Sequence, residues 1–227
     1  MSGGFHASAR GPSVRLSADN MTACRLQPRA GYNGGMVFAS EPIRLGEMFT
    51  VQIDRIVSVW CGSIEVGLVQ ADPLVACQFP SASSIELPCW VLSGEYIYVN
   101  SQRHPATLTS GRTLDDLQPD DTLGLKFVRD GDKANMQIYI NGDFEGICAR
   151  GIPADVATWA VIDMYGTCQQ ISVVPAAAQF DSAENEETLL LPAVISNSET
   201  SDSQRYALVY YNCSYLLCLV MGATTEV

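Results

Sequence analysis

The sequence is poor in the residues from which enzymes most often build acid–base sites. Only two of its 227 residues are histidines, His6 and His104, although histidine is the most common general acid and base. The sequence contains no HExxH, GxSxG, GxGxxG or Walker A motif, so it lacks the signatures of zinc peptidases, serine hydrolases and nucleotide-binding enzymes. Asp130 and Asp132 resemble the start of a calcium loop, but the closing glutamate is missing. We therefore predict that the chain is not an enzyme, and we expect no catalytic, cofactor or metal site.

The chain also lacks an excess of basic residues. It has 13 Lys and Arg residues against 25 Asp and Glu residues, a formal net charge of −12. Proteins that bind nucleic acid carry basic surfaces that replace counterions, so this balance argues against a nucleic-acid partner. The first 30 residues are a local exception, with Arg10, Arg15, Arg25 and Arg29 against the single acid Asp19. These arginines fit either scattered exposed positions or a small basic patch for an acidic partner.

Paired cysteines are absent as well. None of the eight cysteines forms a CxxC pair, and several lie within apolar runs such as SVWCGSIEVG and ELPCWVLSG. A RING-type zinc module needs eight Cys and His ligands in tight pairs, so no RING is predicted in this chain. The opening residues MSGGFHASARGP contain no apolar run of the signal-peptide type. We expect free thiols in a reducing setting, either cytosolic or nuclear, and we predict a cytoplasmic protein.

Long helical patterns and fixed-period repeats are missing, and short alternating strands take their place. Apolar and polar residues alternate in 49–56, 63–69 and 123–128, and Gly-, Pro- and Asp-rich turns separate such runs. This pattern predicts an all-β domain, either a sandwich or a barrel. In MQIYINGDFEGI, residues 136–147, the alternation is interrupted by Asn141-Gly142, which suits a type I′ hairpin turn. We expect Ile138 and Ile140 to face the core.

The composition changes after Pro175. Residues 176–205 are acidic and rich in Ser and Glu, which is typical of a linker. Residues 206–227 form a tail whose apolar run, 206–223, only reaches the minimum length of a membrane-spanning helix. A membrane anchor, a short element packed on the domain, and a tail from an alternative transcript all fit this run. The predicted domain is 1–175.

Four stretches in order and spacing resemble the Neuralized homology repeat, the NHR domain: 37–53, 60–68, 136–147 and 159–174. The segments 87–102 and 113–127 fit the same pattern. The opening run 5–26 is similar too, although His6 lies one residue farther from Gly11 than the family pattern leads us to expect. The resemblance covers about residues 5–174, and it is closest to one repeat of a multi-repeat Neuralized-like scaffold without a RING.

The resemblance implies a concanavalin/SPRY-like antiparallel β-sandwich that binds proteins. It also implies an adaptor role, in which the domain binds a short segment of a partner, such as the intracellular part of Notch ligands or an Asn-x-x-Asn motif. A separate ubiquitin ligase would then act on the complex, at the centrosome for the scaffold relatives. The alternative is a phosphoinositide or membrane-surface module with 206–223 as an apolar anchor. A lectin is suggested by the architecture alone.

The predicted binding surface consists of loops at one end of the sandwich, because a rigid frame commonly supports binding loops. The candidate loops are 31–35, 60–63, 93–98 and 163–167. Within them, interface hot spots favour aromatic residues, and the candidate anchors are Tyr32, Asn33, Trp60, Tyr96 and Tyr165. Trp60 and Tyr165 fit a core or corner position equally well.

Overall fold

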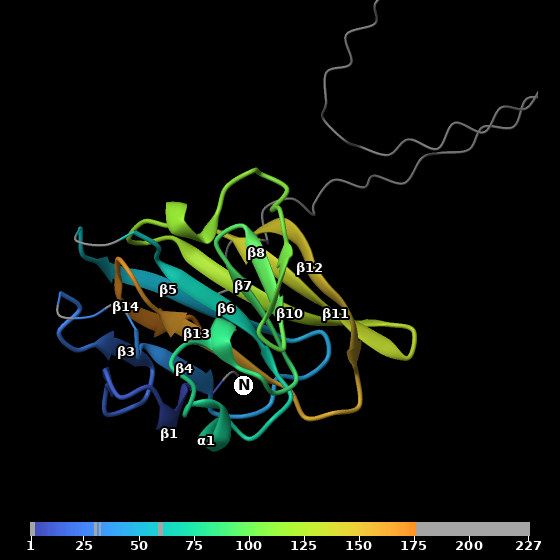
Figure 1. Ribbon diagram of the computed structural model, residues 1–227, viewed down its shortest axis with the longest axis horizontal. Coiled ribbons are helices and arrows are strands. Elements are labelled where there is room, and N and C mark those ends of the chain that lie inside the picture. The colour runs from blue at the N-terminus through green and yellow to red at the C-terminus, as the bar shows by residue number, and fades with distance from the viewer. Residues whose placement is uncertain (1–2, 30, 32, 59–60, 176–227) are drawn as a thin grey trace, which may run out of the picture. The chain divides into compact units, whose positions relative to one another are not determined.

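Two antiparallel sheets of seven strands each form the domain (Figure 1). The computed structural model describes residues 3–29, 31, 33–58 and 61–175. The first sheet runs in the order β1 (Phe5–Arg10), β4 (Met36–Ala39), β13 (Trp159–Met164), β6 (Ile64–Val69), β7 (Cys89–Ser93), β8 (Tyr96–Val99) and β9 (Gln102–Pro105). The second runs β12 (Asp143–Pro153), β11 (Lys133–Ile140), β10 (Thr122–Asp130), β5 (Met48–Ile56), β14 (Cys168–Val173), β3 (Thr22–Arg25) and β2 (Val14–Leu16). The all-β prediction is confirmed, and the fold is a sandwich, not a barrel. The predicted linker and tail lie outside the described residues.

The core lies between the sheets and follows the alternation of the strands. In β5, Phe49, Val51 and Ile53 are buried and face the first sheet's inner side chains. In β11, Ile138 and Ile140 are 0% and 2% exposed, so the prediction that they face the core is confirmed. A strand with one face toward a core and one toward solvent shows this period of two.

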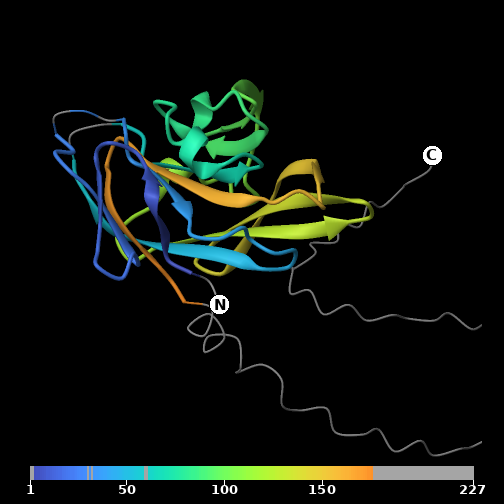
Figure 2. The same ribbon diagram turned by 90° about the horizontal axis from the view of Figure 1, so that it is seen from below.

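Strand β6 departs from this pattern, because all six of its residues are buried. The segment between β6 and β7 covers the outer face of the first sheet with a short helix, α1 (Pro73–Ala76), and a 3₁₀ turn, η1 (Ala82–Ser84). The turned view in Figure 2 shows this green segment on the side away from the second sheet. The cover makes a second, smaller apolar cluster, in which Phe38, Val91 and Val161 are buried on the outer face.

The hairpin of β11 and β12 is held at its turn by an asparagine side chain. Asn141 and Gly142 both have positive φ, 54° and 86°, as the predicted type I′ turn requires. The Asn141 Oδ1 atom accepts a hydrogen bond from the Thr122 amide at 2.8 Å, and Nδ2 donates to Asp121 Oδ1 at 2.7 Å. The turn residue therefore fastens the hairpin to the segment that leads into β10.

We predict that Asn141→Gly lowers the free energy of unfolding by about 1–2 kcal/mol, because glycine keeps the positive φ while both side-chain hydrogen bonds are lost. Urea unfolding of the full chain measures this change. The matched control is Asn20→Gly, at φ 57°, where the asparagine side chain makes no hydrogen bond within the described residues. An equal effect of the two changes would show that Asn141 acts only through its backbone conformation.

Candidate functional site

The described parts of the four predicted loops meet at one end of the sandwich, which we call the loop end. The prediction of a loop over 93–98 is wrong for most of its length, because only 94–95 form a turn and 96–98 belong to β8. The antiparallel registers pair Asp163 with Met36, Asp163 with Glu65, and Glu65 with Ser93. The loop before β4, the loop before β6, the turn after β7 and the loop after β13 must therefore meet at the same edge. A further 3₁₀ turn, η2 (Leu114–Asp116), buries Leu114 in the core at this end.

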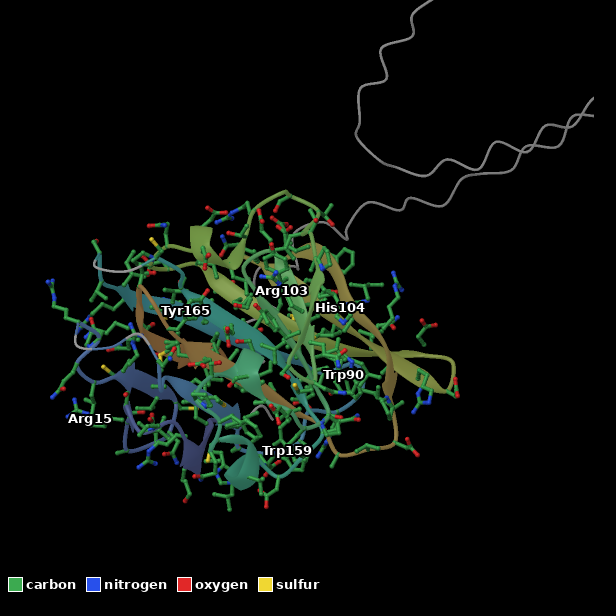
Figure 3. All side chains as sticks on the ribbon, viewed as in Figure 1. Arg15, Trp90, Arg103, His104, Trp159 and Tyr165 are labelled. Carbon is green, nitrogen blue, oxygen red and sulfur yellow. The ribbon has the colours of Figure 1, made fainter. Side chains whose placement is uncertain are left out.

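Tyr165, in the loop after β13, holds together this loop, the loop before β6 and the turn η2. Its amide donates to the Ser63 carbonyl at 3.1 Å, and its ring packs against Gly62, where a Cβ would overlap it. Its hydroxyl donates to Asp115 Oδ1 on η2 at 3.2 Å. Burial first, and then the negative charge of Asp115, raises the pKa of Tyr165 to about 12, so the phenol stays protonated and can donate. Tyr165 is therefore a half-buried fastening residue (Figure 3).

Main-chain hydrogen bonds complete the fastening of these loops. The Met164 amide donates to the Gly35 carbonyl at 3.2 Å, and the Thr167 amide donates to the Gly62 carbonyl at 2.8 Å. The Thr167 hydroxyl donates to the same carbonyl at 3.0 Å. The buried guanidinium of Arg25, on β3, donates to the Gly166 carbonyl. The loop end is thus built from both sheets and is preformed.

A buried pair of carboxylates lies on the outer face of the first sheet beside the loop end. Glu65 and Asp163 are cross-strand neighbours and are 5% and 0% exposed. The amides at the start of η1 bond them: Ala82 donates to Asp163 Oδ2 at 3.0 Å and Ser83 donates to Glu65 Oε2 at 2.8 Å. The Ser93 hydroxyl donates to Glu65 Oε1 at 2.9 Å. The pair therefore anchors η1 to the sheet.

Burial raises the pKa of both carboxyl groups, that of Asp163 to about 7. For Asp163 the negative charge of Glu65 adds to this effect, because two neighbouring carboxylates in a dry site resist ionisation together. Sequence reasoning missed this pair. The signal for it was a lone acid within each apolar strand, in SIEVGLV and WAVIDMYG.

The predicted anchors do not converge on one pocket. Tyr96, which begins β8, lines a cleft of about 300 Å³ with Glu95, Leu108 and Arg112. Its ring also stacks on the guanidinium of Arg103, 4.5 Å from the ring centroid. Tyr32 and Trp60 lie outside the described residues. Asn33 precedes β4, Tyr165 follows β13 and Tyr96 begins β8. In the order β4-β13-β6-β7-β8, the strand of Tyr165 lies between the other two.

Asn33 lines a separate hollow of about 480 Å³, which we call the arginine–amide groove. The residues that carry its chemistry are Arg10, Ser13, Asn33, Gln78, Phe79 and Pro80. They come from β1, the turn after it, the loop before β4 and the segment after α1. Sequence reasoning found Asn33 but not its neighbours, because Gln78 and Phe79 belong to the cover of the first sheet.

Charge divides the loop end into two sides. The segment 112–121 carries Asp115, Asp116, Asp120 and Asp121 against Arg112, whose guanidinium pairs with Asp121 at 3.4 Å. The side formed by β1, β2 and β3 carries the exposed arginines Arg10, Arg15 and Arg29 instead, with Arg15 at the left of Figure 3. Such a division orients a charged segment that lies across the loop end. Arg25 is buried, so the expectation of an exposed position or a basic patch is wrong for this arginine.

In the described part of the chain, no three His, Cys, Asp or Glu side chains come together as metal ligands. Among residues 3–29, 31, 33–58 and 61–175, no helix is long and apolar enough to cross a membrane.

Comparisons with known proteins agree on one family. The family model described as Neuralized matches residues 5–175. Human E3 ubiquitin-protein ligase NEURL3 is 31% identical over 177 residues, which cover 77% of this chain and 60% of that protein. Mouse Neuralized-like protein 2 is 24% identical over 221 residues, which cover 75% of this chain and 76% of that protein. The chain thus spans less than two thirds of the length of NEURL3.

Solved structures share the fold. The crystal structure of the Drosophila melanogaster Neuralized NHR1 domain has a TM-score of 0.58 at 23% identity and covers 76% of this chain and 98% of that one. The human HERC1 SPRY domain has a TM-score of 0.52 at 14% identity, with coverage of 76% and 98%. The sandwich is therefore of the type found in NHR and SPRY domains, as the sequence resemblance implies.

Proposed function

The chain belongs to the Neuralized family, with residues 5–175 as its NHR domain, and from this premise we propose that it is an adaptor that binds a short segment of a partner protein. The observation that carries the proposal is the preformed loop end. Loops from separate strands are fastened around Tyr165 by side-chain and main-chain hydrogen bonds, and the cleft at Tyr96 and the groove at Asn33 lie in the same end. A preformed surface saves the entropy of ordering on binding.

We further propose that the bound partner is regulated through ubiquitin by a separate ligase. NEURL3 carries the name of an E3 ubiquitin-protein ligase, and this chain is predicted to have no RING of its own. The partner is then a substrate segment, of the Asn-x-x-Asn type or from a Notch ligand, or a component of the ligase. The resemblance to one repeat of a RING-less scaffold, and with it a cytoplasmic and centrosomal location, stays a prediction.

The test is affinity capture from cytosolic extract with the full chain. We expect Asn33→Ala/Tyr96→Ala to lose partners that the wild type captures, because it removes one amide and one aromatic ring from the two hollows. The matched control is Gln102→Ala/Tyr98→Ala. Gln102 is exposed at the opposite end of the sandwich, and Tyr98 is two residues farther along β8.

Thermal unfolding of all three proteins separates lost binding from lost folding. Capture that is identical for the wild type and both variants would contradict the proposal. The membrane-surface alternative rests on the N-terminal arginines and on 206–223, which lies outside the described residues. It predicts that the full chain floats with anionic vesicles, that Arg15→Glu reduces the flotation, and that no protein partner is captured.

A further inference from the structure

The arginine–amide groove has a floor that is fixed before any ligand arrives. The Gly11 amide, after the end of β1, donates to the Met36 carbonyl at 2.7 Å. The Ser13 amide donates to the Gly34 carbonyl at 3.0 Å. Gly34 has φ +81°, and a Cβ added at Gly11 would come within 2.4 Å of the Gly34 carbonyl oxygen, so glycine at these two positions lets the two segments approach this closely. Arg10 and Asn33 are therefore presented by a rigid pair of turns.

The charge of this groove is opposite to that of the chain. The net charge of the protein is −12, yet the described residues that line the groove include Arg10 and no aspartate or glutamate. Arg10 is exposed, and its guanidinium donates to the nearby Ala7 carbonyl. A guanidinium has five N–H donors, so one such bond leaves others for a carboxylate, which it can hold in a bidentate pair.

The chain that enters the groove from α1 is apolar, and we call Leu74, Val75 and Phe79 the apolar rim. Leu74 and Val75 are 48% and 51% exposed on this helix, and the chain then runs through Gln78 to Phe79 and Pro80 in the groove. Helix α1 packs against β1, so the apolar rim begins on an element that neighbours the strand of Arg10. A single exposed leucine is ordinary, but an apolar group beside a preformed charged groove is typical of an interaction site.

The two amides of the groove suit the main chain of an extended peptide. The Gln78 Nε2 atom donates to the Leu74 carbonyl at 3.3 Å, which leaves Oε1 as an acceptor. The Asn33 side chain is exposed and offers both a donor and an acceptor. Amides in such positions can pair with peptide N–H and C=O groups whatever the peptide's side chains are. Sequence preference must then come from the cation and the apolar rim.

We propose that the arginine–amide groove binds an acidic peptide segment of a partner protein, with a carboxylate on Arg10 and an apolar side chain against Leu74, Val75 and Phe79. This inference rests on the proposed function and goes beyond it, because it names one of the two hollows and the chemistry of its ligand. The acidic 112–121 side of the loop end repels such a segment, so the segment's carboxylates lie toward β1.

The test uses fluorescein-labelled peptide pools and the full chain at low ionic strength, with anisotropy as the signal. One pool is rich in Asp and Glu with a single Leu or Phe, and the other has Asn and Gln in place of Asp and Glu. We expect the acidic pool to bind about tenfold more tightly or better, and the preference to weaken as salt is added. Arg10→Glu should remove the preference.

The matched control is Arg129→Glu, since Arg129 is also exposed and also donates to a nearby main-chain carbonyl, that of Gly131, at 3.4 Å. It makes the same change of net charge at the tip of the β10–β11 hairpin. Arg10→Lys is the second variant: it keeps the charge but loses the bidentate geometry, and intermediate binding is expected. Thermal unfolding checks the fold of each variant.

Four outcomes would overturn the inference: binding of neither pool, equal binding of both pools, tighter binding of the amide pool, and equal loss in Arg10→Glu and Arg129→Glu. A labelled peptide of residues 176–204 and a sedimentation run at increasing concentration test the two other occupants. If that peptide binds through Arg10 and the acidic pool does not, the groove serves the chain's own acidic segment. If Arg10 instead controls self-association, it serves a second copy.

The adaptor proposal and the acidic-peptide inference can fail independently of each other. If capture from extract depends on Asn33 and Tyr96 but not on Arg10, the domain is still a segment-binding adaptor, and only the acidic ligand on Arg10 is lost. If capture is unaffected by every loop-end variant while the acidic pool still binds through Arg10, the groove stands and the adaptor proposal fails.

Discussion

Gly166→Ala is expected to destabilise the domain by about 3 kcal/mol or more. Gly166 has φ +53°, a left-handed conformation that costs an L-residue about 1–2 kcal/mol. A Cβ at this position would also overlap the carbonyl oxygens of Gly62 and Cys61. These are main-chain atoms, and the Gly62 carbonyl is held by two hydrogen bonds from Thr167. The loop cannot give way without breaking the contacts that fasten the loop end, and urea unfolding measures the loss.

A control substitution, Gly46→Ala, separates the cost of the positive φ from the cost of the close main-chain contact. Gly46 also has positive φ, +84°, but no atom lies within 4 Å of the Cβ that alanine would add. Gly46→Ala should therefore cost only the conformational term, about 1–2 kcal/mol. Similar losses for the two substitutions would show that the close approach of 61–62 to 166 does not stabilise the domain.

The buried pair of Glu65 and Asp163 is expected to make the domain less stable as the pH rises from about 4 to about 7. The ordinary pKa of Asp163 is 3.8 and its folded value is raised to about 7, so the folded state holds its proton more tightly than the unfolded state. Stability is then greatest below the unfolded pKa and falls until the folded pKa is passed. The full shift corresponds to about 4 kcal/mol at most.

Asp163→Asn tests this dependence. The variant cannot ionise at this position, so its stability should fall by a smaller amount than that of the wild type between these pH values, whatever its stability at any one pH. Asp19 and Asp121 have lowered pKa values and act in the opposite direction, so the difference between proteins is the informative quantity. Asp132→Asn, at an exposed hairpin tip, is the control. Parallel pH profiles for the wild type and Asp163→Asn would contradict the account.

Local signals explain what the sequence could predict. The alternation in 136–147 depends on neighbouring residues alone, and so does the need of Asn141-Gly142 for positive φ. Ile138, Ile140 and the turn were therefore predictable, and the series of such hairpins led to a sandwich or barrel. The choice between the two needed either the family resemblance or the structure, because it depends on which strands pair.

Contacts between distant segments explain what the sequence could not predict. The pairing of Glu65 with Asp163 joins residues from β6 and β13, and the cover that buries both comes from a third segment, around η1. In the same way, Asn33 lines a groove because Gln78 and Arg10, from distant segments, lie beside it. The family resemblance led to four loops at one end, but their division into a cleft and a groove depends on side chains from segments that no loop motif marks.

The unusual N-terminal spacing coincides with an irregular stretch of β1. His6 lies one residue farther from Gly11 than the family pattern leads us to expect. The register of β1 shifts between Phe5 and Arg10, which pair with Ala39 and Val37. The His6 Nδ1 atom accepts hydrogen bonds from the amides of Ser8 and Ala9, at 3.2 and 2.8 Å, inside this irregular stretch. The unusual spacing therefore falls in the irregular part of β1, where the His6 side chain bonds to the main chain.

The most direct test of the central claim, that the loop end is the surface that binds a partner segment, is site-specific photocrosslinking. The full chain would carry a photoreactive phenylalanine analogue in place of Asn33, or in place of Gln102 at the opposite end, and would be irradiated in cytosolic extract. The account predicts a partner crosslinked from position 33, identified by mass spectrometry, and none from position 102. Crosslinks from position 102 with none from position 33 would contradict it.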